Sequence, residues 1–371
     1  MNKILLKLCI PTLALGMLAS CETATTPPST PVTDTTIVSS HDRALFVVNE
    51  GDFANGSLDV VLFHHVVSIH DSASKSDTTT TIDTIFHQGV LKNLGLGNDV
   101  LVNGNRAYVL DNGLAQIDVV DADSLKSLTA IPFGASNQPN KMALIGPNLL
   151  LVTQRAATSA AIVDLSKDAI VDTIGIGEPS YAVAVLGGKA YVTSGDSSYA
   201  GPFQLNIIDL ASRKVTAVLP LTGSPEQAIA DSTTGQVIIG SAGDYAQQKP
   251  RLYYVRPSVD AIADSLVFGA DGKTDGELIA GPQPMIIISG NSYDVFKLDE
   301  TNHQLGADLI HNSPHFYKGF YDATGNELYF GVYDFSSGGG KVDVYDGTTG
   351  TYRWSFSDPA GIAPAHFAFY H

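Results

Sequence analysis

The chain has 371 residues, 44% of them hydrophobic, and its 21 Lys and Arg against 38 Asp and Glu give a formal net charge of −17. This acidic balance excludes a nucleic-acid binder that relies on a basic surface, and it argues against electrostatic attachment to anionic lipid. The only cysteines are Cys9 and Cys21, so the rest of the chain has no disulfide and no thiol ligand or nucleophile.

Residues 1–20 predict a signal peptide. Lys3 and Lys7 precede an apolar run from Leu8 to Ala19, which is too short to span a membrane as a helix. Small residues stand directly before Cys21, in the sequence Leu-Ala-Ser-Cys. This pattern resembles the lipobox of bacterial lipoproteins, and the resemblance implies cleavage before Cys21 and lipidation of that residue. An ordinary signal peptide followed by a chance cysteine is the alternative.

The segment after Cys21 is rich in Thr, Pro and Ser up to about residue 40. It has few side chains to bury, so we expect residues 21–42 to form a lipidated cysteine and a disordered tether. A folded domain is expected to begin near Arg43 and to cover residues 43–371.

A repeat of 40–50 residues, apart from a first interval of 62, organises this domain. Gly and β-branched runs with almost no helical periodicity indicate an all-β chain. Seven short apolar segments recur, each typical of a buried strand, and the repeat length fits the blades of a propeller. Their central residues are Phe46, Tyr108, Leu151, Tyr191, Ile238, Ile286 and Tyr329. We therefore predict a seven-bladed β-propeller in which these segments are the second strand of each blade.

Two other residue types recur in the same phase. A proline opens the expected first strand at Pro139, Pro179, Pro225, Pro314 and Pro364. An aspartate follows the third strand at Asp121, Asp164, Asp209, Asp299 and Asp346. Aspartate caps tight turns through its own side chain, so these carboxylates are interpreted as hairpin residues and not as metal ligands.

The two ends of the domain complement each other. The first unit begins at its second strand, and the chain stops after PAHFAFYH, which matches a first strand. We expect the C-terminal strand to complete blade 1 and so to close the ring. The long first interval marks an insertion around His64 to Phe86, predicted as an extended hairpin or a loop of unassigned role.

Units such as NGNRAYVLDNGLAQIDVVDADSLKSLTAI resemble YVTN-type β-propellers. The opening LFVVNEGDFANGSLDVV resembles the start of propeller lipoproteins that are common in Bacteroidetes-like bacteria. The resemblance covers roughly residues 43–371, and units five and six depart most from it. It is specific for the fold and weak for the ligand. Some relatives stand beside TonB-dependent outer-membrane transporters, and one group captures cobalamin for them, so a similar accessory role is open here.

Four of the seven loops between second and third strands are long, those of blades 1, 4, 5 and 7. Each carries an aspartate five or six residues past the strand centre with an aromatic close behind. The pairs are Asp52/Phe53, Asp196/Tyr199, Asp244/Tyr245 and Asp334/Phe335. They predict an acidic and aromatic rim that could stack on and hydrogen-bond a ligand. The alternative is a duplicated structural loop, with the aspartate turning the chain and the aromatic packing on the blade.

Further candidate residues are expected in loops at the same end of the propeller as these four long loops. They are Glu50, Tyr181, Glu226, Gln227, His315, Phe316, Tyr317 and His366. His315 and His366 belong to adjacent expected blades, but no third ligand accompanies them, so we predict no metal and no other cofactor.

The leading hypothesis is a membrane-anchored binding propeller, expected to be a monomer, that captures a small molecule or nutrient, as an accessory to a TonB-dependent transporter in one version. We expect it in the outer membrane, with the cell surface slightly favoured over the periplasmic face. A scaffold or adhesion protein that binds protein or glycan is the second reading. A periplasmic hydrolase or lactonase is the third, although the common catalytic motifs are missing from the sequence.

Overall fold

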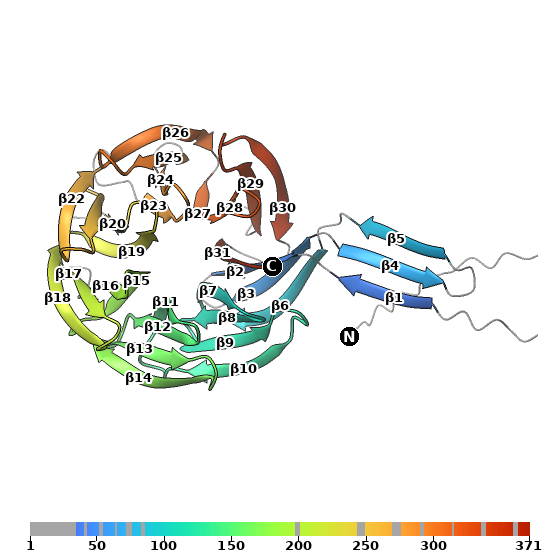
Figure 1. The fold of residues 1–371 in the computed structure, drawn as a ribbon, viewed down its shortest axis with the longest axis horizontal. Coiled ribbons are helices and arrows are strands. Elements are labelled where there is room, and N and C mark those ends of the chain that lie inside the picture. The colour runs from blue at the N-terminus through green and yellow to red at the C-terminus, as the bar shows by residue number, and fades with distance from the viewer. Residues whose placement is uncertain are drawn as a thin grey trace, which may run out of the picture. The chain divides into compact units, whose positions relative to one another are not determined.

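The computed structural model describes residues 35–40, 43–51, 55–63, 65–71, 76–82, 86–196, 201–242, 249–268, 276–289, 293–313, 315–334, 339–358 and 363–371. Among these residues the regular structure is entirely strand. Seven antiparallel four-stranded sheets stand around a common axis (Figure 1). The predicted seven-bladed propeller is confirmed.

Each blade runs from an innermost strand at the axis to an outermost strand at the rim. Blade 1 contains β31 (Pro364–Tyr370), β2 (Arg43–Asn49), β3 (Gly56–Phe63) and β6 (Phe86–Leu94). Blade 2 contains β7 (Gly97–Asn103), β8 (Arg106–Asp111), β9 (Gln116–Asp121) and β10 (Ser127–Pro132). Blade 3 contains β11 (Pro139–Gly146), β12 (Leu149–Gln154), β13 (Ser159–Asp164) and β14 (Ala169–Gly175).

The remaining blades repeat this order. Blade 4 contains β15 (Ser180–Leu186), β16 (Lys189–Gly195), β17 (Phe203–Asp209) and β18 (Lys214–Leu221). Blade 5 contains β19 (Ser224–Asp231), β20 (Gln236–Ala242), β21 (Arg251–Arg256) and β22 (Ala261–Val267). Blade 6 contains β23 (Gly276–Ile279), β24 (Met285–Ser289), β25 (Tyr293–Asp299) and β26 (Gln304–Ser313). Blade 7 contains β27 (Phe316–Asp322), β28 (Glu327–Asp334), β29 (Gly339–Asp346) and β30 (Tyr352–Asp358).

The C-terminal strand closes the ring, as predicted. Strand β31 pairs antiparallel with β2, with Phe46 opposite Ala368 and Leu45 opposite Phe369. Residues that are more than 300 positions apart therefore share one sheet. Because β2 lies between β31 and β3 in this sheet, neither of its edges is left open for pairing with another chain.

Alternating apolar residues of each second strand form the core. Ala44, Phe46 and Val48 pack in the cluster between blades 1 and 2, whereas Leu45 and Val47 pack in the cluster between blades 1 and 7. This alternation follows from the two-residue period of a strand, which sends successive side chains to opposite faces. One such buried cluster lies at each of the seven contacts between neighbouring blades.

The recurring aspartates at the ends of third strands are hairpin residues, as predicted. The Asp121 and Asp209 carboxylates accept hydrogen bonds from the backbone N–H groups of Ser124 and Ser212, each at 2.7 Å. Asp164, Asp299 and Asp346 make the same kind of bond in their own turns. Hydrogen bonds from the backbone and the hydroxyl of Ser124 lower the pKa of Asp121, and those from the hydroxyl and the backbone of Ser212 lower the pKa of Asp209.

A separate three-stranded sheet has the order β1-β4-β5, formed by β1 (Thr35–Ser40), β4 (His65–Asp71) and β5 (Ser76–Ile82). Strands β4 and β5 come from the insertion, which agrees with the predicted hairpin. Strand β1 comes from the segment predicted as a tether, so six residues of that segment pair within a sheet. Its β-branched Thr35, Thr36, Ile37 and Val38 suit a strand, but a pairing partner so distant in sequence gave no local signal.

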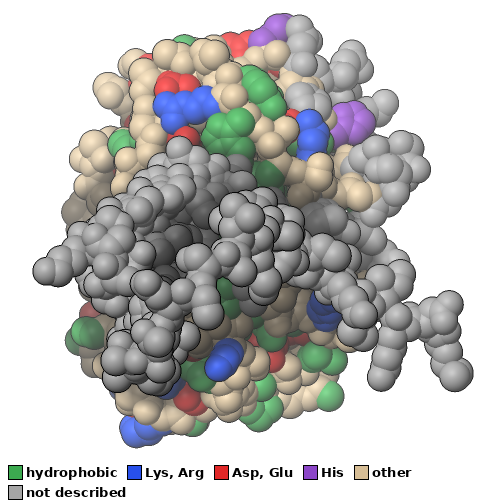
Figure 2. All heavy atoms as spheres, turned by 90° about the vertical axis from the view of Figure 1, so that its right-hand side faces the viewer, with side chains coloured by type: hydrophobic (Ala, Val, Ile, Leu, Met, Phe, Trp, Pro, Cys, Tyr) green, Lys and Arg blue, Asp and Glu red, His purple; other side chains and the backbone are tan. Residues whose placement is uncertain are grey.

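No helix in the described part of the chain is long and apolar enough to cross a bilayer. On the described part of the face shown in Figure 2, acidic, basic and hydrophobic side chains are interspersed. This mixture is typical of a solvated protein surface.

Arg43 connects blade 1 to blade 7 through hydrogen bonds. Its guanidinium donates to the carboxylates of Asp322 at 3.0 Å and Glu327 at 3.2 Å, and to the hydroxyl of Tyr329 at 2.8 Å. It also stacks over the ring of Phe369 on β31, 4.4 Å from the ring centre. The three charged side chains are largely buried, with exposures of 16% for Arg43, 4% for Asp322 and 13% for Glu327.

We predict that Arg43→Ala lowers the free energy of unfolding by about 3 kcal/mol, because it leaves two buried carboxylates without this cation. Urea titration followed by circular dichroism measures the change. The matched control is Arg213→Ala, which removes an exposed ion pair with Asp172 and should cost less than about 1 kcal/mol. Equal effects of the two substitutions would contradict the assigned role of Arg43.

Blades 5 and 6 meet at a pair of carboxyl groups that share a proton. Burial and a hydrogen bond with Asp231 raise the pKa of Glu300 to about 8. Asp231 is itself 2% exposed, and donors in the adjacent turn satisfy its carboxylate, including the N–H of Thr233 at 2.8 Å. Protonated Glu300 therefore donates to ionised Asp231 at neutral pH.

This pair predicts a loss of stability toward alkaline pH. The folded-state pKa of Glu300 lies above its ordinary value of 4.5, so its stabilising contribution is complete below pH 4.5 and lost as the pH rises through 8. Glu300→Gln keeps a hydrogen-bond donor that does not titrate. The melting temperature of this variant, relative to that of the wild type, should rise between pH 6 and pH 9. A difference that stays constant with pH would refute the shared proton.

Candidate functional site

The innermost strands place polar side chains at one level of the central channel. In four blades, a polar residue of the innermost strand pairs with a residue at the equivalent position of the second strand. These pairs are His366 with Val48, Asp99 with Leu110, Gln227 with Gly240 and Lys318 with Gly331. The backbone N–H groups of Lys141 and Ala182 donate to Thr153 and Thr193, at the same level of blades 3 and 4. In blade 6 the equivalent residue is Gly276, and Glu277 follows it. We call the set His366, Asp99, Lys141, Ala182, Gln227, Glu277 and Lys318 the channel ring.

Contacts between blades that are not neighbours show that this level faces the axis. The Nζ atom of Lys141, in blade 3, lies 3.3 Å from the Nδ1 atom of His366, in blade 1. Blade 2 stands between these two blades in the ring (Figure 1). The two side chains therefore meet on the axial side of β7, where the Lys141 ammonium also donates to the Asn98 carbonyl at 2.6 Å.

One hydrogen-bonded array crosses from blade 7 to blade 3. The Tyr317 hydroxyl donates to the Glu50 carboxylate, whose other oxygen lies 3.4 Å from Nε2 of His366. The array is self-consistent when His366 is neutral and carries its proton on Nε2. Nε2–H then donates to Glu50, and Nδ1 accepts from the Lys141 ammonium.

A second array occupies blades 5, 6 and 7. The Lys318 ammonium donates to the Glu277 carboxylate at 2.8 Å, and the Gln227 side-chain amide donates to the same oxygen. The Gln227 carbonyl oxygen in turn accepts from the backbone N–H of Leu278 at 2.5 Å. Both arrays lie at the end of the channel where the innermost strands begin, which we call the channel mouth.

The surroundings shift the pKa of each charged group at the channel mouth. Burial alone would raise the pKa of Glu50, but the hydrogen bond and the charge of His366, which is protonated at acidic pH, outweigh it together with the hydrogen bond from Tyr317 and the charge of Lys318, and lower the pKa to about 2. Burial, followed by the charge of Lys141, lowers the pKa of His366. Glu50 is therefore ionised and His366 neutral at pH 7.

The two lysines of the channel ring are shifted in opposite directions. Burial lowers the pKa of Lys141, and the charge of Lys318 lowers it further against the opposing effect of Asp99. Burial also acts on Lys318, but the charge and hydrogen bond of Glu277 outweigh it and raise the pKa of Lys318. Lys318 thus has a carboxylate partner, whereas the described residues place no carboxylate within 4 Å of the Lys141 ammonium.

Several predicted site residues reach the channel mouth. Glu50, Tyr317, Gln227 and His366 take part in the two arrays. Tyr317 is 38% exposed, and of the described Tyr, Phe and Trp side chains only Tyr352, at 51%, is also exposed.

Other predicted residues have different surroundings. Tyr181 is buried, and its hydroxyl donates to the carbonyl of Asp196 at 2.9 Å, so it fixes the backbone at the end of β16. His315 is exposed and packs against Tyr293 with 5.0 Å between ring centres, whereas His366 contacts Glu50 and Lys141. Within the described ranges no three His, Cys, Asp or Glu side chains come together as metal ligands.

The rim predicted from the long loops lies mostly outside the described residues. This holds for Asp52, Phe53, Tyr199, Asp244, Tyr245 and Phe335, and the predicted lipidation site Cys21 also lies outside the described residues. Asp334 is the last residue of β28, and its side chain is not described. The loop hypothesis therefore stays a prediction.

Sequence reasoning missed Asp99, Lys141, Glu277 and Lys318. A signal for some of them was present, because the second residue after an opening proline is Lys141 after Pro139, Gln227 after Pro225 and His366 after Pro364. Examining the second residue after each opening proline would therefore have identified part of the channel ring. Asp99 and Glu277 have no such proline before them.

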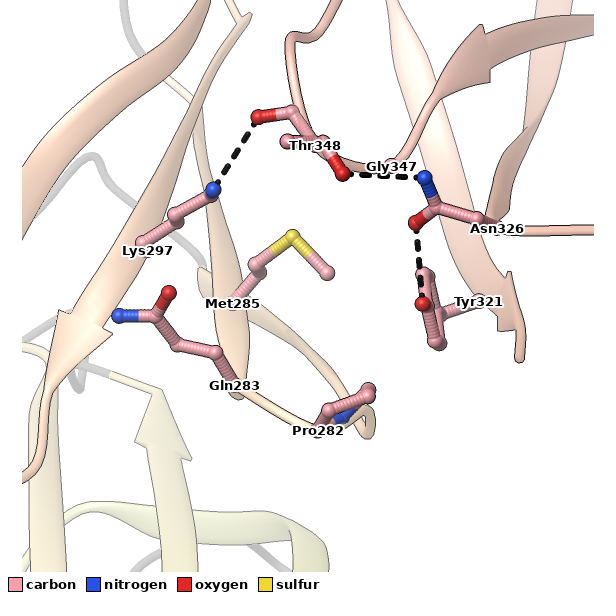
Figure 3. A pocket seen from close by; sticks show the side chains of 8 residues that line it. All are labelled: Pro282, Gln283, Met285, Lys297, Tyr321, Asn326, Gly347 and Thr348. Carbon is pink, nitrogen blue, oxygen red and sulfur yellow. Dashed lines mark hydrogen bonds between the residues drawn. The ribbon is translucent and has the colours of Figure 1, made fainter.

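A shallow pocket lies at the opposite end of blades 6 and 7 (Figure 3). Its polar side chains bond to one another and to nearby backbone. The Tyr321 hydroxyl donates to Asn326 at 3.1 Å, Asn326 donates to Thr348 at 3.0 Å, and Lys297 donates to the Thr348 carbonyl at 3.2 Å. The first two bonds join turns within blade 7, and the third joins Lys297 of β25 in blade 6 to blade 7, which accounts for these residues as structural.

Comparisons with known proteins show the fold alone. No family model matches the sequence, and no curated protein matches it. Among solved structures, Kuenenia stuttgartiensis hydrazine synthase is similar with a TM-score of 0.59 and 13% identity, over 73% of this chain and 88% of that chain. The Neurospora crassa Pan2 WD40 domain is similar with a TM-score of 0.54 and 10% identity, over 72% of this chain and 81% of that chain. At these identities the likeness supports a β-propeller, and membership of the YVTN-type family stays a prediction.

Proposed function

We propose that this protein is a binding module that holds a polar ligand at the mouth of the propeller channel. The observation that carries the proposal is the meeting of charged side chains from blades 1, 3, 6 and 7 at the axis. Withdrawing charges from water costs several kcal/mol per ion before pairing offsets it. Buried apolar clusters already hold each blade to its neighbours, so this cost is not needed for the fold. Costly polar clusters of this kind gather at functional sites.

The channel mouth has the mixture of groups that ligand sites use. Tyr317 offers an exposed aromatic face, and the side chains of Glu50 and Lys318 are 20% and 26% exposed, so a ligand can reach them. A few convergent polar groups beside an aromatic surface fix the orientation of a bound molecule. In the sequence, the predicted rim residues Asp52 and Phe53 follow closely after Glu50, and both lie outside the described residues.

The arrangement favours binding over acid–base catalysis. His366 would be the natural proton-transfer group, but both of its ring nitrogens are engaged, one by Glu50 and the other by Lys141. A general base must present a nitrogen to the substrate proton. His366 instead connects two charges and holds them in register.

The N-terminal sequence supports anchoring of this module in the outer membrane. In this proposal Cys21 carries lipid, the following segment connects it to the propeller, and the channel mouth captures a small molecule or nutrient for a TonB-dependent transporter. The support is the basic and apolar run followed by small residues and Cys21. Several acyl chains hold a protein firmly at a membrane, since each buried methylene contributes about 0.8 kcal/mol.

Replacing Tyr317 should release the ligand. The lipidated protein is purified from native outer membranes with mild detergent, and retained small molecules are measured by mass spectrometry. Wild type should retain a compound, and Tyr317→Ala should retain it with affinity reduced on the order of tenfold or more, the loss typical of a central aromatic contact. The matched control is Tyr352→Ala, which alters a tyrosine that is 51% exposed on the outermost strand of blade 7.

Two results would count against a small-molecule site at the channel mouth. One is equal retention of the compound by Tyr317→Ala and Tyr352→Ala. The other is recovery of the wild type with no compound at all, which would favour a protein or glycan partner instead. Far-UV circular dichroism of each variant verifies that the propeller is folded.

Lipidation has its own test. Cys21→Ser should abolish labelling by an alkyne fatty acid and move the protein from the membrane pellet to the soluble fraction, because serine has no thiol for the lipid. Cys9→Ser should leave both readouts unchanged, since Cys9 lies within the predicted signal peptide. Membrane retention of unlabelled Cys21→Ser would refute the proposed anchor.

A further inference from the structure

We infer that the ligand of the channel mouth carries an oxyanion group, as found in carboxylates and phosphate esters, which binds the ammonium groups of Lys141 and Lys318. The inference rests on the proposed function and names the chemical class of its ligand. It follows from the N–H donors of Lys141 and Lys318 that are not used within the two arrays, and from the charge of Lys141.

The carboxylates of the channel ring and of Glu50 already have donors. Glu50 accepts from Tyr317 and His366, and Glu277 accepts from Lys318 and Gln227. The two oxygens of Asp99 accept from the backbone N–H groups of Met142 and Val100, at 2.8 Å and 3.1 Å. Each of these three carboxylates is thus already bound by two donors of the protein.

The ammonium groups, by contrast, retain donors. A lysine ammonium has three N–H donors and no acceptor. Within the described part of the chain, Lys141 uses two of them, on the Asn98 carbonyl and His366. Lys318 uses one, on Glu277. One donor of Lys141 and two of Lys318 are therefore available to a ligand, and an oxyanion supplies the matching acceptors.

The local charge of Lys141 favours an anion in direct contact with its ammonium. Burial withdraws Lys141 from water, and its hydrogen-bond partners among the described residues are a carbonyl and a neutral imidazole, so Asp99, Glu277 and Glu50 stabilise its charge only from a greater distance. Lys318 is close enough for its charge to lower the pKa of Lys141. A bound oxyanion would offset both the desolvation of Lys141 and the repulsion between the two ammonium groups.

Binding of defined anions tests the inference. Succinate, citrate, inorganic phosphate and glycerol phosphate are titrated into the full-length protein by calorimetry at constant ionic strength, with putrescine as the cationic probe. We expect at least one of the anions to bind and putrescine not to bind. Carboxylates and phosphates form separate arms, so the preferred arm identifies the type of oxyanion.

Matched variants locate the binding. Lys141→Met and Lys318→Met should each reduce anion affinity at least tenfold, because removing one partner of a partly desolvated charge contact is costly. Lys214→Met is the control, since Lys214 is exposed at the start of the outermost strand β18. It should bind anions as the wild type does.

The pH profile separates direct contact from a structural effect. The charged and titratable groups around Lys141 are His366, Asp99, Lys318, Glu277 and Glu50. Since burial lowers the pKa of Lys141, anion affinity should begin to fall at a pH below the ordinary lysine value of about 10.4. In Lys141→Arg this fall should disappear, because a guanidinium stays protonated.

Three outcomes overturn the inference: none of the four anions binds, putrescine binds in their place, or both lysine-to-methionine variants bind anions like the wild type. Retention of a natural compound that depends on Tyr317, together with any of these outcomes, would leave the proposed binding function in place and refute only the oxyanion class. If the protein retains no compound in a Tyr317-dependent way and the anion test also fails, both proposals are refuted.

Discussion

The pairing of β31 with β2 is the constraint on which the rest of the structure depends. It places the last strand of the chain at the axis of the first blade and thereby closes seven sheets into a ring. It also brings His366 beside Glu50 and within reach of Lys141. The fold and the candidate site thus share one origin, and the Arg43 network strengthens the same joint from β2 to blade 7 and to Phe369 of β31.

The fold was predictable because its signals are local and repeated. Each second strand carries an apolar core at a regular interval, and turn aspartates such as Asp121 and Asp209 mark the same phase. Closure by the C-terminus followed from counting strands. Strand β1 was not predictable, because β2 and β3 separate it from its partner β4 in the chain and neither segment carries a motif that indicates the other.

The site was less predictable for a physical reason. His366 and Gln227 were named from their place before or within first strands, but Lys141 and Lys318 look like ordinary solvated lysines in the sequence. Only ring closure brings Lys141 against a histidine from a blade two positions away. The channel ring therefore depends on contacts between distant blades, whereas blade architecture depends on contacts within one repeat. The channel mouth combines two hydrogen-bonded arrays, one aromatic face and one ammonium without a carboxylate partner among the described residues.

The most direct test of a ligand site at the channel mouth is an anomalous-scattering map from a crystal of this protein soaked in a bromide salt. We expect a bromide peak within hydrogen-bond distance of the Lys141 or Lys318 ammonium, at the level of the channel ring. Peaks confined to the outer strands or to the pocket between blades 6 and 7, with none at the channel ring, would contradict it.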